Sequence, residues 1–254
     1  MIAVILCAGF GTRMYPLTRE FPKPLLPVAD RPVIDYLMDQ IAELPFLKAV
    51  HIISNRKFID HYKDWREARS GDGGPEGFRI ELHDNGVTTN EKRLGAAADL
   101  RLVFKRIDEP SRAMVSGGDN IYRFSLKPLW EVFVENDQHY VVAIPETDPV
   151  KLKKTGVLEL DKNGRVLRLL EKPQNPPSTW GCPPLYFLQP SAWPMLDTFV
   201  ENADNLDAPG HFIDYLCRTE CVSAFKLNSS RLDIGSLESY READRILGRH
   251  PLAL

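Results

Sequence analysis

The sequence predicts an α/β fold in three layers, α/β/α, with a mostly parallel sheet and a small α+β portion towards the carboxyl end. Residues 2–8 form a continuous apolar run that stops at a glycine, as is typical of a parallel strand buried on both faces. Further apolar runs alternate with segments of helical periodicity as far as residue 150. Beyond residue 155 the expected strands follow one another across a short turn, which favours a hairpin.

In the first half of the chain, strands and helices are expected to alternate. Apolar residues recur at helical spacing from Val33 to Leu44, and Asp30 and Pro32 precede them as helix-start signals. A Gly-rich segment at 70–77 indicates a surface loop. The expected strands are 2–8, 49–54, 78–83, 113–117 and 139–145, and the expected helices are 33–44, 57–68, 94–107 and 127–136. This alternation predicts crossover units, because parallel strands cannot be joined by tight turns.

In the second half, segments 155–160 and 165–170 flank the residues Asp-Lys-Asn-Gly. Two strands around such a turn predict a β-hairpin. The Pro-rich segment 173–184 then leads into the last elements. These are expected as strands 185–188 and 222–227 and helices 191–203, 211–219 and from about 236.

The composition is that of an ordinary globular protein. Hydrophobic residues make up 43% of the 254 residues, and the formal net charge is −3. This excludes a disordered or collagen-like chain, and the lack of a basic excess argues against a nucleic-acid binder. The chain shows neither a secretory signal nor an apolar stretch near the ~20 residues of a membrane span, so we expect a cytoplasmic protein.

The four cysteines, at 7, 182, 217 and 221, are too scattered for a disulfide framework. Cys217 and Cys221 are four residues apart, a spacing that predicts two half-buried thiols on one helical face. No matching His or Cys pair accompanies them in the sequence. A metal site made of these cysteines is therefore not expected.

The first loop carries the strongest chemical signal. Gly9 and Gly11 follow the first strand, where two glycines let backbone N–H groups approach a phosphate. A plain turn is an equally good interpretation of this pair alone. A dinucleotide fingerprint would need a third glycine where Met14 stands, and a Walker loop would need Gly-Lys-Ser/Thr where Gly11-Thr12-Arg13 stands.

Two cations extend this signal. Arg13 and Lys23 lie ten residues apart on one segment, and Lys23 stands between Pro22 and Pro24. The prolines restrict the backbone and would hold the ammonium in place. Cations beside free N–H groups form the kind of cradle that a triphosphate needs before substitution at phosphorus.

Together these residues resemble a known family. Gly9-x-Gly11-Thr12-Arg13 followed by Pro22-Lys23-Pro24-Leu25-Leu26 is similar to the signature of the sugar-1-phosphate nucleotidylyltransferases. The resemblance implies a Rossmann-like fold of the nucleotide-diphospho-sugar transferase type. It also implies that Arg13 and Lys23 are catalytic. The nucleotide-binding residues that it implies in this loop are Ala8, Gly9, Gly11 and Thr12.

Two later motifs extend the resemblance to a metal site. Gly118-Asp119-Asn120 resembles the family's Gly-Asp-Asn, and Asp233-Ile-Gly235 resembles its Asp-Ile-Gly. The resemblance implies that Asp119 and Asp233 bind Mg²⁺, a cofactor for which one or two carboxylates suffice. Without the family, Gly118-Asp119-Asn120 would be interpreted as a turn, and Asp233 and Ser236 as helix caps.

The remaining motifs concern the base and the acceptor. Gly95, in a segment similar to the family's Leu-Gly-Thr-Ala-Gly, is the expected base contact, with Asn90 and Glu91 as weaker candidates. Glu171-Lys172-Pro173 matches the family's Glu-Lys-Pro, which implies that Lys172 holds the acceptor phosphate and that Glu171 lies near its hydroxyls. Gly156 matches a glycine near the sugar, and Trp180 is an expected stacking surface for a sugar or a choline-like group.

The resemblance implies a Mg²⁺-dependent enzyme that transfers NMP from an NTP to a sugar-1-phosphate and releases pyrophosphate. Pro183 and Pro184 remove N–H donors where the family has a sugar contact. A cytidylyltransferase for phosphocholine or a phosphonate is therefore the alternative, and a non-catalytic nucleotide-sugar sensor is a further one. An NAD-dependent oxidoreductase is disfavoured by Met14.

We expect the partners to be an NTP and a phosphorylated small-molecule acceptor, with no nucleic acid and no membrane; a homo-oligomer is left open. The expected organisation is one domain over 1–254, with a nucleotide-binding half at 1–150 and an acceptor-binding half at 151–254. Because the chain ends soon after Asp233, no further domain is expected behind it.

Overall fold

The computed structural model describes residues 1–70 and 77–249. The chain clusters into two compact units. Unit 1 comprises Met1–Arg93, Gly117–Lys127 and Ser230–Leu254, and unit 2 comprises Leu94–Ser116 and Pro128–Ser229. The chain passes between the units several times, and the expected division into halves near residue 150 stays a prediction. The loop expected at 70–77 falls almost entirely outside the described residues.

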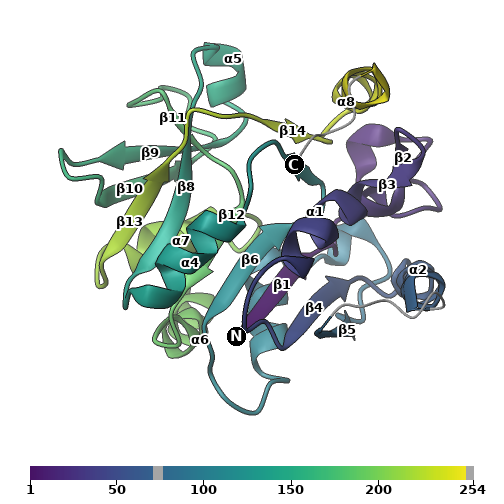
Figure 1. The fold of residues 1–254 in the computed structure, drawn as a ribbon, viewed down its shortest axis with the longest axis horizontal. Coiled ribbons are helices and arrows are strands. Elements are labelled where there is room, and N and C mark those ends of the chain that lie inside the picture. Colours follow the sequence, from purple (N-terminus) through teal and green to yellow (C-terminus); the bar gives the residue numbers. More distant parts are fainter. Residues whose placement is uncertain (71–76, 250–254) are drawn as a thin grey trace. The chain divides into compact units, whose positions relative to one another are not determined.

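Unit 1 contains a parallel sheet in the order β1-β4-β5 (Figure 1). These strands are β1 (Ile2–Leu6), β4 (Ala49–Ser54) and β5 (Arg79–Asp84). Every residue of β4 is buried, including the polar His51 and Ser54, as is typical of a strand that is covered on both faces. Helices α1 (Val33–Ala42), α2 (Ile59–Ser70) and α8 (Leu237–Arg249) complete the unit, with 3-10 turns η1 (Thr12–Met14), η2 (Lys23–Leu25) and η3 (Asn90–Lys92).

Two short strand pairs in unit 1 were not predicted. The strand β2 (Pro27–Val28) pairs with β3 (Arg31–Pro32) across Ala29 and Asp30. Both turn residues have positive φ, 48° and 63°, as a two-residue hairpin turn requires. Asp30 therefore belongs to this turn and is not a start signal of α1, whose N-cap is Pro32 without a side-chain cap. The second pair joins β7 (Asn120–Tyr122) to β14 (Arg231–Asp233).

A buried cluster links the segments of unit 1 that carry the sequence motifs. Its members come from the first loop, α1, β7, the turn after β14 and α8, and they are Met14, Leu26, Val28, Val33, Tyr36, Ile121, Ile234, Ala243 and Leu247. Met14, the residue that excludes a dinucleotide fingerprint, is fully buried there. Arg13 directly precedes Met14, and Asp233 directly precedes Ile234. Because Met14 and Ile234 pack in the same cluster, the backbone at Arg13 and Asp233 is fixed by a common core.

The start of α8 confirms the cap expected at Ser236. The Ser236 hydroxyl accepts a hydrogen bond from Ser239 N at 3.2 Å, and the Ser239 hydroxyl accepts from Gly235 N and Ser236 N. Because these bonds satisfy N–H groups at the helix end, we expect Ser236→Ala to lower the free energy of unfolding by about 1 kcal/mol. Urea unfolding measures this effect, and an unchanged midpoint would show that the cap contributes nothing.

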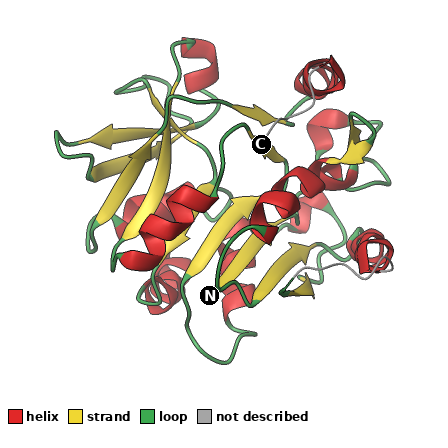
Figure 2. Ribbon diagram, viewed as in Figure 1, coloured by secondary structure: helices red, strands yellow, loops and turns green. Residues whose placement is uncertain are grey.

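Unit 2 contains a mixed sheet in the order β10-β9-β11-β8-β12-β6, with β13 parallel to β8; these strands are labelled in Figure 1, and Figure 2 shows all strands in yellow. The strands are β6 (Ala113–Gly117), β8 (His139–Pro145), β9 (Gly156–Leu160), β10 (Val166–Glu171), β11 (Trp180–Cys182), β12 (Leu185–Leu188) and β13 (Val222–Lys226). The helices are α3 (Ala96–Phe104), α4 (Lys127–Glu135), α5 (Pro149–Leu152), α6 (Ala192–Asn202) and α7 (Gly210–Leu216). Phe104 of α3 stacks on Trp193 of α6 at 4.0 Å between ring centroids.

The expected α/β class is confirmed, and four strands have the predicted bounds: 49–54, 113–117, 139–145 and 185–188. The predicted hairpin is also present, as β9 and β10. The prediction for the paired thiols is wrong. Cys217 is the buried C-cap of α7, and Cys221 is exposed beyond that helix. Within 1–70 and 77–249, no helix is long and apolar enough to cross a membrane.

Candidate functional site

Side chains of Asn55 and Thr18 hold the loop after β1 by hydrogen bonds to its carbonyl groups, and Gly9 of this loop is exposed. Asn55 donates to Ala8 O at 3.0 Å, and the Thr18 hydroxyl donates to Gly11 O at 2.8 Å. Gly11 has φ 63°, which favours glycine. Gly9 is exposed, and none of the described atoms lies within 4 Å of the place where its Cβ would be. Gly9 is therefore not required by packing, and its bare backbone leaves room for a ligand.

Lys23 and Asp119 form an ion pair in unit 1. The Lys23 Nζ donates to Asp119 Oδ2, and the two side chains are 15% and 27% exposed. Pro22 is extended and Pro24 lies in the first turn of η2, so the prolines flank the lysine as expected from the sequence. An ion pair with restricted solvent access is screened less than a surface pair.

The close approach of Gly118 to the first loop positions Asp119. Gly118 N donates to Leu6 O at 3.1 Å, and a Cβ on Gly118 would lie 2.4 Å from the Cys7 Sγ. Only glycine therefore fits at this position without a shift of its neighbours. Asp119 Oδ1 accepts from the Asn120 side chain at 2.7 Å.

Burial alone would raise the pKa of Asp119, but the Lys23 ammonium, assisted by the nearby Arg231, holds this pKa below its ordinary value. The carboxylate is therefore ionised at neutral pH. Arg231 also donates to the Asn120 side-chain oxygen. Sequence analysis did not assign Arg231 to the site; its position two residues before Asp233, on the same face of a strand, is the signal that could have found it.

The strand pair β7–β14 brings Asp233 next to Asp119. Asp233 is the register partner of Asn120, and Ile234 N donates to Asp119 O at 3.0 Å. A Cβ on Gly235 would lie 3.5 Å from Asp233 Oδ1 and 3.6 Å from Arg13 Nη2. Arg13 and the two aspartates therefore gather around the same turn, with Lys23 on Asp119. These four residues lie together in unit 1, while their chemical roles stay predictions.

The expected base contacts lie on two segments. Asn90 begins η3 in unit 1, and Gly95 is the N-cap of α3 in unit 2. Gly95 is buried with φ 92°, and a Cβ there would lie 2.4 Å from the Leu206 carbonyl oxygen. Packing within unit 2 thus explains this glycine without a ligand. A role for Asn90 and Gly95 in base binding stays a prediction.

We expect Gly95→Ala to lower the free energy of unfolding by at least about 2 kcal/mol, because the methyl group meets backbone and the φ is unfavourable for alanine. Gly86→Ala is the matched control, since Gly86 also has positive φ, 80°, but nothing within 4 Å of its Cβ position among the described atoms. Urea unfolding compares the two variants. Equal losses would show that the contact with Leu206 is not the cause.

The expected acceptor residues lie on adjacent strands of unit 2. Gly156 is the register partner of Glu171 on β10, and Cys182 of β11 is the register partner of Gly156. Lys172 follows directly, is exposed, and has φ 48°. A non-glycine residue in this region costs about 1–3 kcal/mol, and such strain concentrates at functional sites.

Glu171 and Trp180 already have protein partners. A Cβ on Gly210, the first residue of α7, would overlap the Glu171 carboxylate, so this side chain lies against the start of that helix. The Lys226 ammonium lies 5.7 Å from the centroid of the Trp180 ring, within the range of a cation–π contact. Their role in acceptor binding stays a prediction.

The chain is similar in sequence and in fold to proteins of known function. Residues 2–249 match the family model described as "Nucleotidyl transferase". The chain is 28% identical over 250 residues to a UTP–glucose-1-phosphate uridylyltransferase (AglF) of Haloferax volcanii, covering 97% of this chain and 96% of that protein. It is 26% identical to glucose-1-phosphate adenylyltransferase 2 of Vibrio vulnificus, covering 96% of this chain and 66% of that protein. A solved structure of UDP-glucose pyrophosphorylase with UDP-glucose superposes with a TM-score of 0.82 at 20% identity, covering 98% of both chains.

Proposed function

Because the chain belongs to the nucleotidyl transferase family, we propose that it transfers the nucleoside monophosphate of an NTP to a sugar-1-phosphate. The products are a nucleotide sugar and pyrophosphate. The observation that carries this proposal is the gathering of Arg13, Lys23, Asp119 and Asp233 in unit 1 beside a glycine loop with an open backbone. The names of the relatives support a sugar-1-phosphate as the acceptor.

In the proposed reaction, an oxygen of the acceptor phosphate attacks the α-phosphorus of the NTP. The new O–P bond forms as the bond from the α-phosphorus to the bridging oxygen breaks, and pyrophosphate leaves with that electron pair. Arg13 and the backbone N–H groups near Gly9 and Gly11 bind the leaving phosphates. Lys23 stabilises the charge that develops around the α-phosphorus.

No covalent nucleophile takes part in this scheme. Cys7 lies in the same loop, but burial raises the pKa of its thiol to about 12, so the thiol stays protonated at neutral pH. Direct displacement needs only positioning and charge neutralisation from the protein. This is the kind of catalysis that the four charged residues can supply.

The donor set of Asp119 and Asp233 fits Mg²⁺. Asp119 Oδ1 accepts from Asn120 and Oδ2 accepts from Lys23, and a carboxylate oxygen retains a second lone pair beyond such a bond. Mg²⁺ takes one or two carboxylates together with phosphate oxygens and water. When bound, it would supply charge neutralisation at the phosphates. Asp119 and Asp233 would hold it there.

For the acceptor, we propose that Lys172 binds the phosphate and that Gly156 and Glu171 lie near the sugar. The Lys226 ammonium beside Trp180 argues against a choline headgroup on that face of the ring, because two cations would repel each other. This observation favours a sugar phosphate over phosphocholine.

A substrate matrix tests the proposal. Each of the common NTPs is combined with glucose-1-phosphate, other sugar-1-phosphates, phosphocholine and a phosphonate, and pyrophosphate release is measured with and without Mg²⁺. We expect release only with an NTP and a sugar-1-phosphate together, in the presence of Mg²⁺. If phosphocholine is the only acceptor that gives pyrophosphate, the acceptor in the proposal is phosphocholine and not a sugar-1-phosphate. If no pair of NTP and acceptor gives pyrophosphate, the proposal is contradicted.

A further inference from the structure

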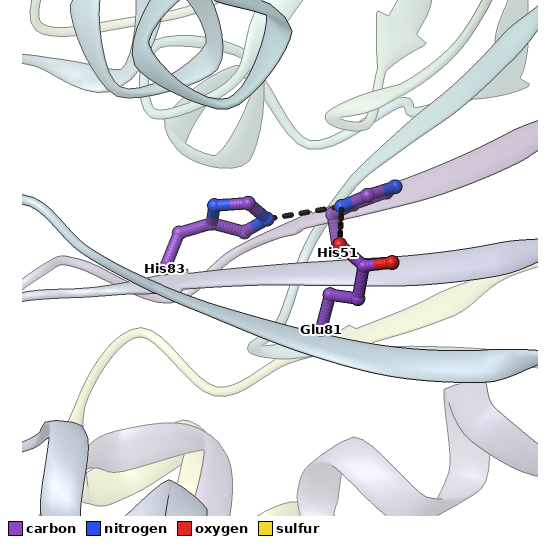
Figure 3. A group of neighbouring side chains, drawn as sticks. All are labelled: His51, Glu81 and His83. Atoms are coloured by element: carbon purple, nitrogen blue, oxygen red, sulfur yellow. Dashed lines mark hydrogen bonds and ion pairs between the residues drawn. The ribbon is translucent and has the colours of Figure 1, made fainter. Parts of the chain in front are cut away.

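Three potential metal ligands meet on the β4–β5 strand pair of unit 1. His51 lies on β4 and is the register partner of Glu81 on β5. Glu81 and His83 are two residues apart on one strand, so both side chains stand on the same face of the sheet. Figure 3 shows the three side chains turned toward one another. None of them takes part in the proposed transfer reaction.

The donor atoms have spacings that suit one small metal ion. The Nδ1 of His51 lies 2.9 Å from the Nε2 of His83 and 3.6 Å from the Oε2 of Glu81. One ligand atom from each residue lies within 4.8 Å of the others. Tetrahedral zinc with ligands at ~2.0–2.1 Å separates its donor atoms by about 3.3 Å. The two measured spacings lie on either side of this value.

The burial of the two histidines also favours a metal ion. The histidines are 3% and 6% exposed, while the Glu81 side chain is 42% exposed and so leaves the cluster open to solvent on one side. Arg79 Nη2 lies 3.6 Å from Glu81 Oε1, whereas Oε2 is the carboxylate oxygen that faces His51.

We propose that His51, Glu81 and His83 bind one zinc ion, with a water molecule as the fourth ligand. Two imidazoles and one carboxylate form a ligand set typical of Zn²⁺, whereas Mg²⁺ and Ca²⁺ prefer oxygen ligands alone. The ion would join β4 to β5, the last strand in the order β1-β4-β5, and would stabilise that strand pair.

The position of the cluster separates it from the proposed Mg²⁺ site. Val4 of β1 is the register partner of His51 and lies four residues before Ala8. At ~3.3 Å per residue, His51 lies about 13 Å down the sheet from the glycine loop. His83, the register partner of Ile53, lies about 7 Å down the sheet and two strands, or about 10 Å, to the side of β1. The zinc site and the transfer reaction can therefore be tested independently.

Direct zinc binding tests the proposal. Tag-free protein, stripped of metal with a chelator, is dialysed against Zn²⁺ in excess Mg²⁺, which saturates sites made of oxygen ligands alone. We expect one zinc ion per wild-type chain. Glu81→Gln and His83→Gln should each weaken the affinity by at least about 100-fold, since the loss even of a residue that supports a ligand costs 10–100-fold. His211→Gln, which alters a partly exposed histidine of unit 2, is the matched control.

Two further readouts keep this test decisive. Co²⁺ in place of Zn²⁺ should give the visible absorption of a four-coordinate site in the wild type and in His211→Gln only. Zn²⁺ should raise the Tm of these two proteins but not of His83→Gln, whose folding is checked by circular dichroism. The proposal is overturned if the wild type binds no zinc in Mg²⁺, or if folded Glu81→Gln and His83→Gln bind zinc as tightly as the wild type.

Discussion

Lys23→Met is expected to lower kcat/KM for pyrophosphate release by at least about 100-fold. Methionine is nearly as long as lysine, but it has neither the positive charge nor the N–H donors of the ammonium group. In the proposed mechanism, that charge stabilises the transition state, and a 100-fold loss corresponds to about 2.7 kcal/mol. Initial rates of pyrophosphate release at varied NTP measure the effect. The loss should appear in kcat, because an interaction made mainly in the transition state lowers kcat more than substrate binding.

Lys63→Met is the control for this variant. Lys63 is also a lysine of unit 1 and also pairs with an aspartate, Asp60, but both side chains are largely exposed on α2. Surface pairs of this kind contribute little, so we expect the control to keep wild-type kinetics. Folding of Lys23→Met is checked by its Tm. Near wild-type turnover in a folded Lys23→Met would remove this lysine from the mechanism.

Asp119→Asn is expected to reduce kcat/KM by a similar factor, at least about 100-fold. Asparagine has nearly the same shape, but it cannot supply the negative charge that pairs with Lys23 and binds a hard cation. A weakened apparent affinity for Mg²⁺ is the specific readout. The Mg²⁺ concentration for half-maximal rate should rise in Asp119→Asn, whereas a merely structural defect would leave it unchanged.

The control for Asp119→Asn is Asp60→Asn, the partner of the exposed lysine control. We expect no change in rate or in Mg²⁺ dependence for this variant. The double variant Lys23→Met/Asp119→Asn should lose much less than the product of the two single losses, since groups that act as one unit are not additive. A Mg²⁺ dependence identical to the wild type in Asp119→Asn would contradict the assignment of this carboxylate.

The sequence predicted the strands that are short, mostly apolar runs between turn or polar residues. The runs of β4, β6, β8 and β12 are four to seven residues long, and the structure has their bounds. The three-residue strands β7 and β14 are too short to show a period of two, so they were missed. Asp30 was assigned to the start of α1 because the hairpin turn at Ala29 and Asp30 was not recognised. This turn needs positive φ at Ala29, and alanine rarely adopts positive φ, so the sequence does not indicate the turn.

The residues of the candidate site also fall into those that local sequence predicts and those that it does not. The glycine loop, Arg13 and Lys23 are close in sequence, so their physical chemistry could be interpreted directly. Asp119 and Asp233 are brought together by the register of β7 and β14, which no local pattern specifies. Only the resemblance to a family linked them. Arg231 lies two residues before Asp233, a spacing that sequence analysis did not use. His51 and His83 lie on different strands, and no motif joins them.

The central claim is that an acceptor phosphate displaces pyrophosphate from an NTP, and isotopic labelling tests it most directly. Wild-type protein is incubated with Mg²⁺, glucose-1-phosphate and UTP labelled either at the α- or at the γ-phosphate. The proposed reaction places the α-label in the nucleotide sugar and the γ-label in pyrophosphate, and neither transfer occurs without the acceptor. An α-label that appears only in free UMP, or a γ-label that appears in the sugar, would contradict the account.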